Sequence, residues 1–123
     1  MVSVIRGDDN FDSAEALSTW TSSTFAWAID TTYSFTHDLG VAPKAFSVEY
    51  VCVTAIYGYA VGDTAFNMNE RYSNWGQIVL KPTSTTVKMA MLDAGILVRR
   101  QDTQSTVSFA NSTYFHVRLN LLG

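Results

Sequence analysis

Charged side chains are scarce in this chain of 123 residues. They make up 15% of it, against roughly a quarter in an average soluble domain, whereas hydrophobic residues make up 47%. The net charge is −3, and Arg99 and Arg100 are the one pair of adjacent basic residues. A nucleic-acid-binding face needs several basic side chains against phosphates, so we expect no nucleic-acid partner. We expect instead that apolar surface is left over for a partner protein.

Cysteine and long apolar runs are also missing. The single cysteine, Cys52, excludes a disulfide within the chain and stands in an apolar stretch, which favours a buried core position over a nucleophile. There is no secretory signal pattern and no run long enough to span a bilayer. The length predicts one domain, residues 1–123. The absences predict a chain made in a reducing cytosol and not inserted in a membrane.

The residues that carry catalysis are few and scattered. His37 and His116 have no nucleophile or acid at a recognisable spacing. The acidic cluster at 8–12 does not follow the register of an EF-hand, and it suits a solvated turn and a helix cap better than a calcium loop. No pair of carboxylates is indicated for glycoside hydrolysis. We therefore predict no enzyme activity, no catalytic residue, no metal site and no cofactor.

Hydrophobic residues alternate with polar ones along most of the chain, which is the pattern of half-buried β-strands. Many short strands separated by turn residues favour an all-β fold, an antiparallel β-sandwich. Two prolines, Pro43 and Pro82, fall at the ends of predicted strands, where a missing N–H costs least. The predicted strands are 25–29, 33–35, 44–55, 77–80, 85–91, 95–99 and 113–121.

The same two-residue alternation predicts which residues of the later strands face the core. In 85–91 we expect Val87, Met89 and Met91 to face the core, and 93–95 has the composition of a hairpin turn. The segment 113–121 alternates most cleanly. Its inward-facing residues are predicted to be Phe115, Val117, Leu119 and Leu121.

One helix is predicted near the start of the chain. Asp12 and Glu15 have the spacing of a capping box, which suggests a short helix ending at about Trp20. The apolar residues 1–5 suit an edge strand or an arm onto a neighbour. We therefore interpret 1–24 as an N-terminal arm and short helix that form an attachment or interface segment.

The stretch HDLGVAPK, residues 37–44, is predicted to be a rigid elbow between two strands. Asp38 and Gly40 are suited to close a turn, Asp38 by bonding nearby backbone and Gly40 by accepting a positive φ. Pro43 fixes the chain before the next strand. His37 is expected to be structural and to hydrogen-bond the elbow backbone.

A second structural element is predicted at Gly58 and Gly62. No helix and no Lys-Ser/Thr pair follows them, so they do not form a phosphate loop. We expect a glycine-permitted kink in which Asp63 accepts hydrogen bonds from backbone N–H groups or pairs with an arginine.

Aromatic residues gather in the segment that follows. Tyr57, Tyr59, Tyr72 and Trp75 are the candidate ligand-binding residues, with amide and acidic side chains between them. Aromatic rings with amides suit a sugar, and they suit a protein interface equally well. A third interpretation, rings folded back onto the core, stays open, and we rank subunit contact above sugar contact.

The two turn motifs together resemble a pattern in small β domains of tailed-bacteriophage virion proteins, particularly tail fibres. The resemblance covers 33–66, a little over a quarter of the chain. It implies a β-sandwich that assembles as a trimer. The matching residues are Tyr33, Phe35, Thr36, His37, Leu39, Gly40, Pro43 and Lys44, then Gly58, Tyr59, Gly62 and Asp63.

The pattern is also similar to that of H-type lectins, which are trimeric sandwiches that bind N-acetylgalactosamine-type sugars. The later strands here lack the tryptophan pattern of those lectins, so no sugar ligand is carried over. The resemblance implies a structural component of a bacteriophage virion, a tail fibre, tip or collar protein involved in host adsorption and acting as a homotrimer with other virion proteins. A capsid decoration or head-spike protein and a module that binds host-surface glycan are the alternatives.

Overall fold

The computed structural model describes residues 18–66 and 75–123. This part of the chain is all-β, with antiparallel sheets and no helix. It therefore holds no helix able to span a membrane. The strands are β2 (Thr19–Thr21), β3 (Thr31–Thr36), β4 (Ala45–Cys52), β5 (Thr64–Phe66), β6 (Gln77–Leu80), β7 (Thr86–Met91), β8 (Ile96–Arg99), β9 (Thr106–Phe109) and β10 (Phe115–Leu122).

The larger sheet has the strand order β2-β10-β4-β5. Its centre is the antiparallel pair of β10 and β4, eight residues each, in a register that sets Arg118 opposite Glu49. The short strands β2 and β5 extend this pair on its two sides, and Phe66 of β5 lies opposite Glu49. Both edges of the sheet are therefore three-residue strands.

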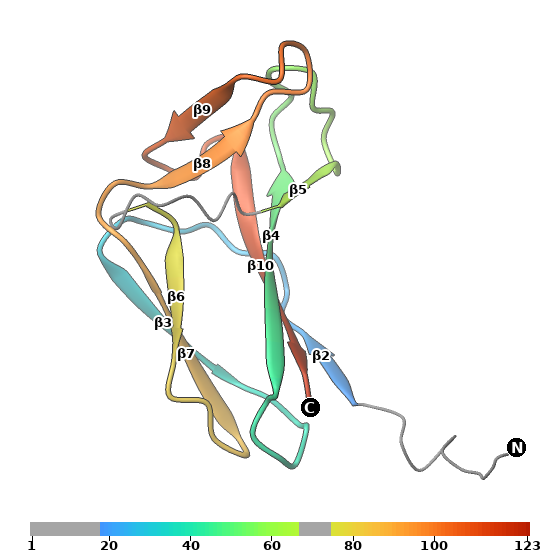
Figure 1. Ribbon diagram of the computed structural model, residues 1–123, viewed down its shortest axis with the longest axis vertical. Helices are drawn as coiled ribbons and strands as arrows, with labels where there is room; N and C mark the ends of the chain where they lie inside the picture. Colours follow the sequence, from blue (N-terminus) through green and yellow to red (C-terminus); the bar gives the residue numbers. More distant parts are fainter. Residues whose placement is uncertain (1–17, 67–74) are drawn as a thin grey trace, which may run out of the picture.

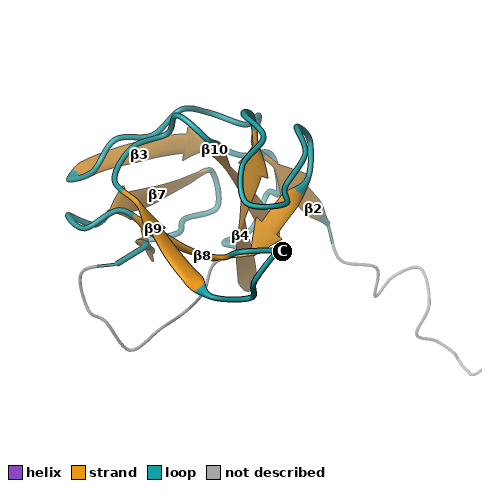
Figure 2. Ribbon diagram, turned by 90° about the horizontal axis from the view of Figure 1, so that it is seen from above, coloured by secondary structure: helices purple, strands orange, loops and turns teal. Residues whose placement is uncertain are grey.

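The smaller sheet has the order β3-β7-β6 and lies across from the first (Figure 1). Viewed from above, β3 and β7 lie on one side of the molecule and β4 and β2 on the other (Figure 2). The hairpin of β8 and β9 crosses the end of the sandwich where β4 finishes (Figure 1). The arrangement is sandwich-like, with the β8–β9 hairpin across one end.

The core lies between the sheets, and the predicted alternation of β7 and β10 is confirmed. Val87 and Met89 are fully buried, as are Val117 and Leu119. Side chains of this size each contribute roughly 1.5–3 kcal/mol when buried. Cys52 is a buried free thiol, as predicted, and burial raises its pKa.

The predicted strand at 25–29 is wrong. This segment contributes one isolated bridge, Phe25 to Val117, although Phe25 and Trp27 both pack against the core. Trp27 is buried and its indole N–H donates to the carbonyl of Phe115 at 2.9 Å, whereas Ile29 is 38% exposed. The tryptophan is held by this hydrogen bond and by packing, without a β ladder.

Two further predictions need correction. Residues 12–17 of the predicted helix lie outside the described residues, but Thr19–Thr21 is a strand, so the helix does not extend to Trp20. The turn at 93–95 does not close a hairpin, because β7 pairs with β3 and β6 whereas β8 pairs with β9. Gly95 has φ +100°, and a Cβ there would overlap the carbonyl oxygen of Phe109. This glycine lets the chain leave one sheet for the hairpin.

Candidate functional site

The elbow at 37–44 is held by the buried ring of His37. The backbone N–H of Leu39 donates to Nδ1 at 3.3 Å, so Nε2 carries the proton and donates to the carbonyl of Thr83 at 2.9 Å. The N–H of His37 also donates to the carbonyl of Thr85 at 2.9 Å. The prediction that His37 bonds the elbow backbone is confirmed.

The far side of the elbow is fastened to the larger sheet. The N–H of Lys44 donates to the carbonyl of Leu122 at 2.7 Å. Gly40 has φ +78°, the left-handed value expected of a turn glycine. In the described part of the chain the side chain of Asp38 makes no hydrogen bond. The ring of His37, and not Asp38, supplies the side-chain hydrogen bond to the elbow backbone. Pro43 precedes β4, as expected.

The second motif forms two tight turns at the opposite end of β4. Tyr57 and Gly58 have φ +53° and +89°, and the N–H groups of Ile56 and Tyr59 donate to each other's carbonyls. A Cβ at Gly58 would lie 2.9 Å from that of Gln101, so this position requires glycine for space as well as for φ. The glycine-permitted kink or bulge expected at Gly58 and Gly62 is therefore a pair of turns.

The carboxylate of Asp63 closes the second of these turns. Its Oδ2 accepts from the N–H of Ala60 at 2.8 Å, and its own N–H donates to the carbonyl of Ala60 at 3.0 Å. Gly62, with φ +96°, donates to the carbonyl of Cys52 at 2.8 Å. Of the two roles predicted for Asp63, the bond to backbone is confirmed.

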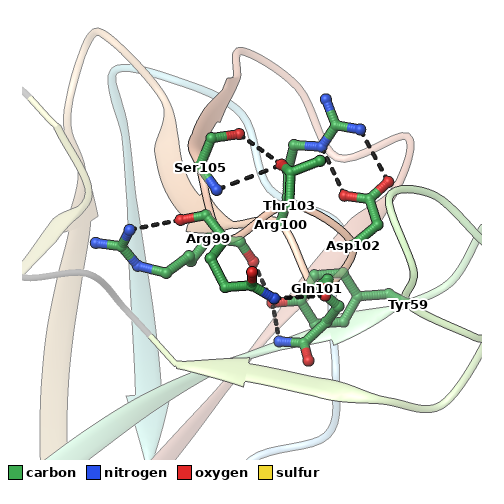
Figure 3. A network of polar contacts seen from close by, with 8 residues as sticks. Tyr59, Arg99, Arg100, Gln101, Asp102, Thr103 and Ser105 are labelled. Carbon is green, nitrogen blue, oxygen red and sulfur yellow. Dashed lines mark hydrogen bonds and ion pairs between the residues drawn. The ribbon is translucent and has the colours of Figure 1, made fainter.

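A polar network links these turns to the loop between β8 and β9 (Figure 3). Arg100 and Asp102 form a bidentate ion pair with both distances at 2.8 Å. The hydrogen bonds of that pair raise the pKa of Arg100 and lower that of Asp102. The guanidinium of Arg100 also lies 4.1 Å from the ring centroid of Tyr57. One face of that ring is therefore covered.

The three candidate ligand-binding aromatics that the structure describes do not form one exposed surface. Tyr59 is 6% exposed, its hydroxyl donates to the carbonyl of Arg99 at 2.6 Å, and its ring meets Phe115 edge-on. Tyr57 and Trp75 are half-buried, and Tyr72 lies outside the described residues. Stacking of Tyr59 on a ligand would require its ring to leave the core.

A small polar hollow lies beside the buried Tyr59. Its volume is about 220 Å³, and Gly58, Asp63, Thr64 and Gln101 form the rest of its lining. The side-chain amide of Gln101 donates to the hydroxyl of Tyr59 at 3.1 Å across this site. Hydroxyl, amide and carboxylate groups here are suited to hydrogen-bond a polyol.

The outer face of the larger sheet carries a second polar network, which sequence reasoning did not single out. Oε1 of Glu49 accepts from Nε of Arg118 at 2.7 Å and from the amide of Asn120 at 3.0 Å. Asn120 also bonds Ser47 and Thr21, so the network crosses three strands. The bond from Arg118 holds the pKa of Glu49 below its ordinary value. Every charge in this network has its partner on the same face.

Two large apolar side chains of this sheet are exposed, one on each face. Phe66, on the edge strand β5 and opposite Glu49, is 70% exposed on the outer face. Phe46, at the start of β4, is 56% exposed, and it lies on the inner face because it pairs with the buried Leu121. A groove of about 490 Å³ crosses β2, β10 and the start of β4. Its lining residues are Thr19, Thr21, Ala45, Phe46, Ser47, Asn120, Leu121 and Leu122.

The described residues include no group of three or more His, Cys, Asp or Glu side chains placed to hold a metal ion. Comparison with protein-family models, with curated proteins and with solved structures finds no match to this chain. The arguments about function therefore depend on the motifs and on the surfaces described above.

Proposed function

We propose that this chain is a structural component of a bacteriophage virion, most specifically a tail fibre, tip or collar protein that takes part in host adsorption as a homotrimer. The observation that carries the proposal is the position of the two motifs at the two ends of β4. The elbow residues finish one end of β4, and the Gly58 and Gly62 turns finish the other end. The resemblance to phage fibre domains therefore rests on residues that have a definite structural task here.

The surfaces give further support. Fibre, tip and collar proteins work by contact with copies of themselves and with other virion proteins. Exposed aromatic residues such as Phe46 and Phe66, on a chain with few charges, suit such contacts. The same features suit a capsid decoration or head-spike protein, so the position in the particle separates these two proposals.

Peptide mass spectrometry of purified particles of the phage that encodes the chain tests this proposal. We expect the chain in the particles at a copy number divisible by three, and antibody labelling in electron micrographs at the tail. Labelling over the head would favour the decoration protein. Absence from particles, with the chain present in infected cells, would contradict a virion role.

Binding of a host-surface glycan is the second candidate, and the polar hollow beside Tyr59 favours it. A glycan array with the purified chain tests this candidate. Binding that is lost in Gln101→Ala, with folding unchanged, would support it. An array without signal would contradict it and would leave the virion proposal untouched.

A further inference from the structure

The two ends of the sandwich are covered differently. The β8–β9 hairpin crosses one end (Figure 1), whereas at the elbow end the sheets leave an apolar slot of about 190 Å³ between them. Most of its wall consists of Phe46 and Leu121 from the larger sheet, Val79 and Val87 from the smaller sheet, and Pro43 and Pro82 from the adjoining loops. Val87 and Leu121 belong to the buried core, so the slot reaches the end of the core.

Apolar side chains are exposed at this end of the molecule. Phe46 is 56% exposed although it lies on the inner face of its sheet, opposite the buried Leu121. Val41 of the elbow and Leu80 at the end of β6 are exposed as well. Water therefore contacts apolar surface that a partner could bury.

The size of the slot suits one large apolar side chain. A dry apolar cavity of about 150 Å³ in another protein holds a benzene molecule. The slot here, at about 190 Å³, is large enough for one phenyl ring or one leucine side chain.

Two lysines without ion pairs stand at the slot. Lys44 is among its lining residues, and Lys81 directly precedes Pro82 in its wall. Both lysines are exposed. In the part of the chain that the structure describes, neither has an ion-pair partner.

The positive charge of this end is a local excess. The segments that meet here are 31–48, 77–88 and 119–123, and they contain three lysines, with Asp38 as the one acidic side chain. The whole chain, by contrast, has a net charge of −3. Carboxylates of a partner therefore complement this end better than the rest of the molecule.

The loops that carry the two lysines are tied in place. His37 donates from Nε2 to the carbonyl of Thr83 and from its backbone N–H to the carbonyl of Thr85, both at 2.9 Å. The N–H of Lys44 donates to the carbonyl of Leu122 at 2.7 Å. The backbone around the slot is therefore ordered before a partner arrives, which lowers the cost of binding.

We propose that this end binds an acidic segment of a partner protein, with one phenylalanine or leucine side chain of that segment in the slot and its carboxylates beside Lys44 and Lys81. A purely apolar segment would take water from two ammonium groups without pairing them. An acidic segment without an apolar residue would leave the slot unfilled. The contact goes beyond the proposed virion role and does not depend on it.

A nuclear magnetic resonance titration of the isotope-labelled chain tests the proposal. The probe is the end-blocked peptide Gly-Asp-Glu-Phe-Asp-Glu-Gly. We expect amide shifts confined to 41–46 and 79–88, with a dissociation constant on the order of 1 mM that rises with added salt. A peptide with alanine in place of phenylalanine, and one with amides in place of all carboxylates, are each expected to bind at least about tenfold more weakly.

Charge reversal on the protein gives the matched comparison. Lys44→Glu combined with Lys81→Glu is expected to raise the dissociation constant at least about tenfold. Lys88→Glu is the control, because Lys88 is exposed and unpaired but lies on the outer face of β7, between the inward Val87 and Met89. It is expected to change the dissociation constant less than about twofold, and the spectra show whether each variant is folded.

Three results would overturn the proposal. The first is the absence of shifts at peptide concentrations on the order of 10 mM, well above the expected dissociation constant. The second is an equal effect of Lys88→Glu and the double variant, which would show attraction to net charge alone. The third is displacement of the peptide by decanoate at much lower concentration, which would assign the slot to a fatty acid. All three would leave the virion proposal standing, because that proposal is tested in particles.

Discussion

The outer faces of the two sheets differ in how their charges and apolar residues are placed. On the four-stranded sheet Glu49, Arg118 and Asn120 form a closed network between an exposed phenylalanine and a groove. On the three-stranded sheet, within the described residues, Lys88 has no ion-pair partner, and it lies between Ser34 of β3 and the exposed Leu80 of β6. Ile78 is exposed there on the edge strand β6.

The two outer faces therefore differ in the pairing of their charges, while both carry exposed apolar side chains. A lone lysine keeps its hydration, and covering it would cost free energy. The paired charges of the other face are half-buried already and lose less on being covered. In the pairing of its charges, the four-stranded face is the less costly of the two for a partner to cover.

The largest effect is expected where the two sheets are joined, because both faces depend on that joint. His37→Ala removes hydrogen bonds to Leu39 N–H and Thr83 carbonyl, two partly buried groups. Each unsatisfied group costs about 1–3 kcal/mol, so we expect a loss of about 2–4 kcal/mol in the free energy of unfolding, measured with urea. Thr36→Ala, one residue earlier and exposed, is the control and is expected to change it by less than about 0.5 kcal/mol. Equal stability of the two variants would contradict the role given to the elbow.

A smaller effect is expected from the network itself. Glu49→Ala leaves Arg118 without its ion pair and removes one of the two acceptors of the Asn120 amide, while Ser47 remains. Solvent screens the half-exposed arginine, so we expect a loss of about 1–2 kcal/mol in the free energy of unfolding of the monomer. Lys88→Ala on the other sheet is expected to cost less than about 0.5 kcal/mol. If the two substitutions have the same effect in urea denaturation, the contrast between the faces is wrong.

The smallest expected effect is a change with pH in the free energy of unfolding that Glu49 contributes. The pKa of Glu49 in the folded protein lies below its ordinary value of 4.5, so its ionisation stabilises the fold. This contribution is complete above about pH 4.5 and is lost as the pH falls through the lower folded pKa. We expect the stability advantage of the wild type over Glu49→Gln to shrink as the pH falls below 4.5. A difference that stays constant from pH 6 to pH 3 would show that the charge of Glu49 adds nothing.

Much of the fold could be predicted from local patterns, and the failures have a physical cause. The alternation of β10 and the burial of Val87 and Met89 follow from a period of two in the sequence. The segment 25–29 has the same period, yet it forms only one bridge, because a strand also needs a partner along its length. The prediction that the turn at 93–95 closes a hairpin fails for the same reason, because the sequence does not state which strands pair.

The candidate site shows the same limit. The elbow residues were found because Gly40 and Pro43 have preferences that act locally. The network of Glu49, Arg118 and Asn120 was missed because its members are 69 and 71 residues apart and meet only through the register of β4 and β10. Their position on the polar side of two alternating strands was the available signal.

The solution mass of the purified chain, measured by light scattering over a range of concentrations, tests the central claim most directly. The account predicts a particle with three times the mass of one chain, stable on dilution. A monomer at every concentration would contradict the homotrimer.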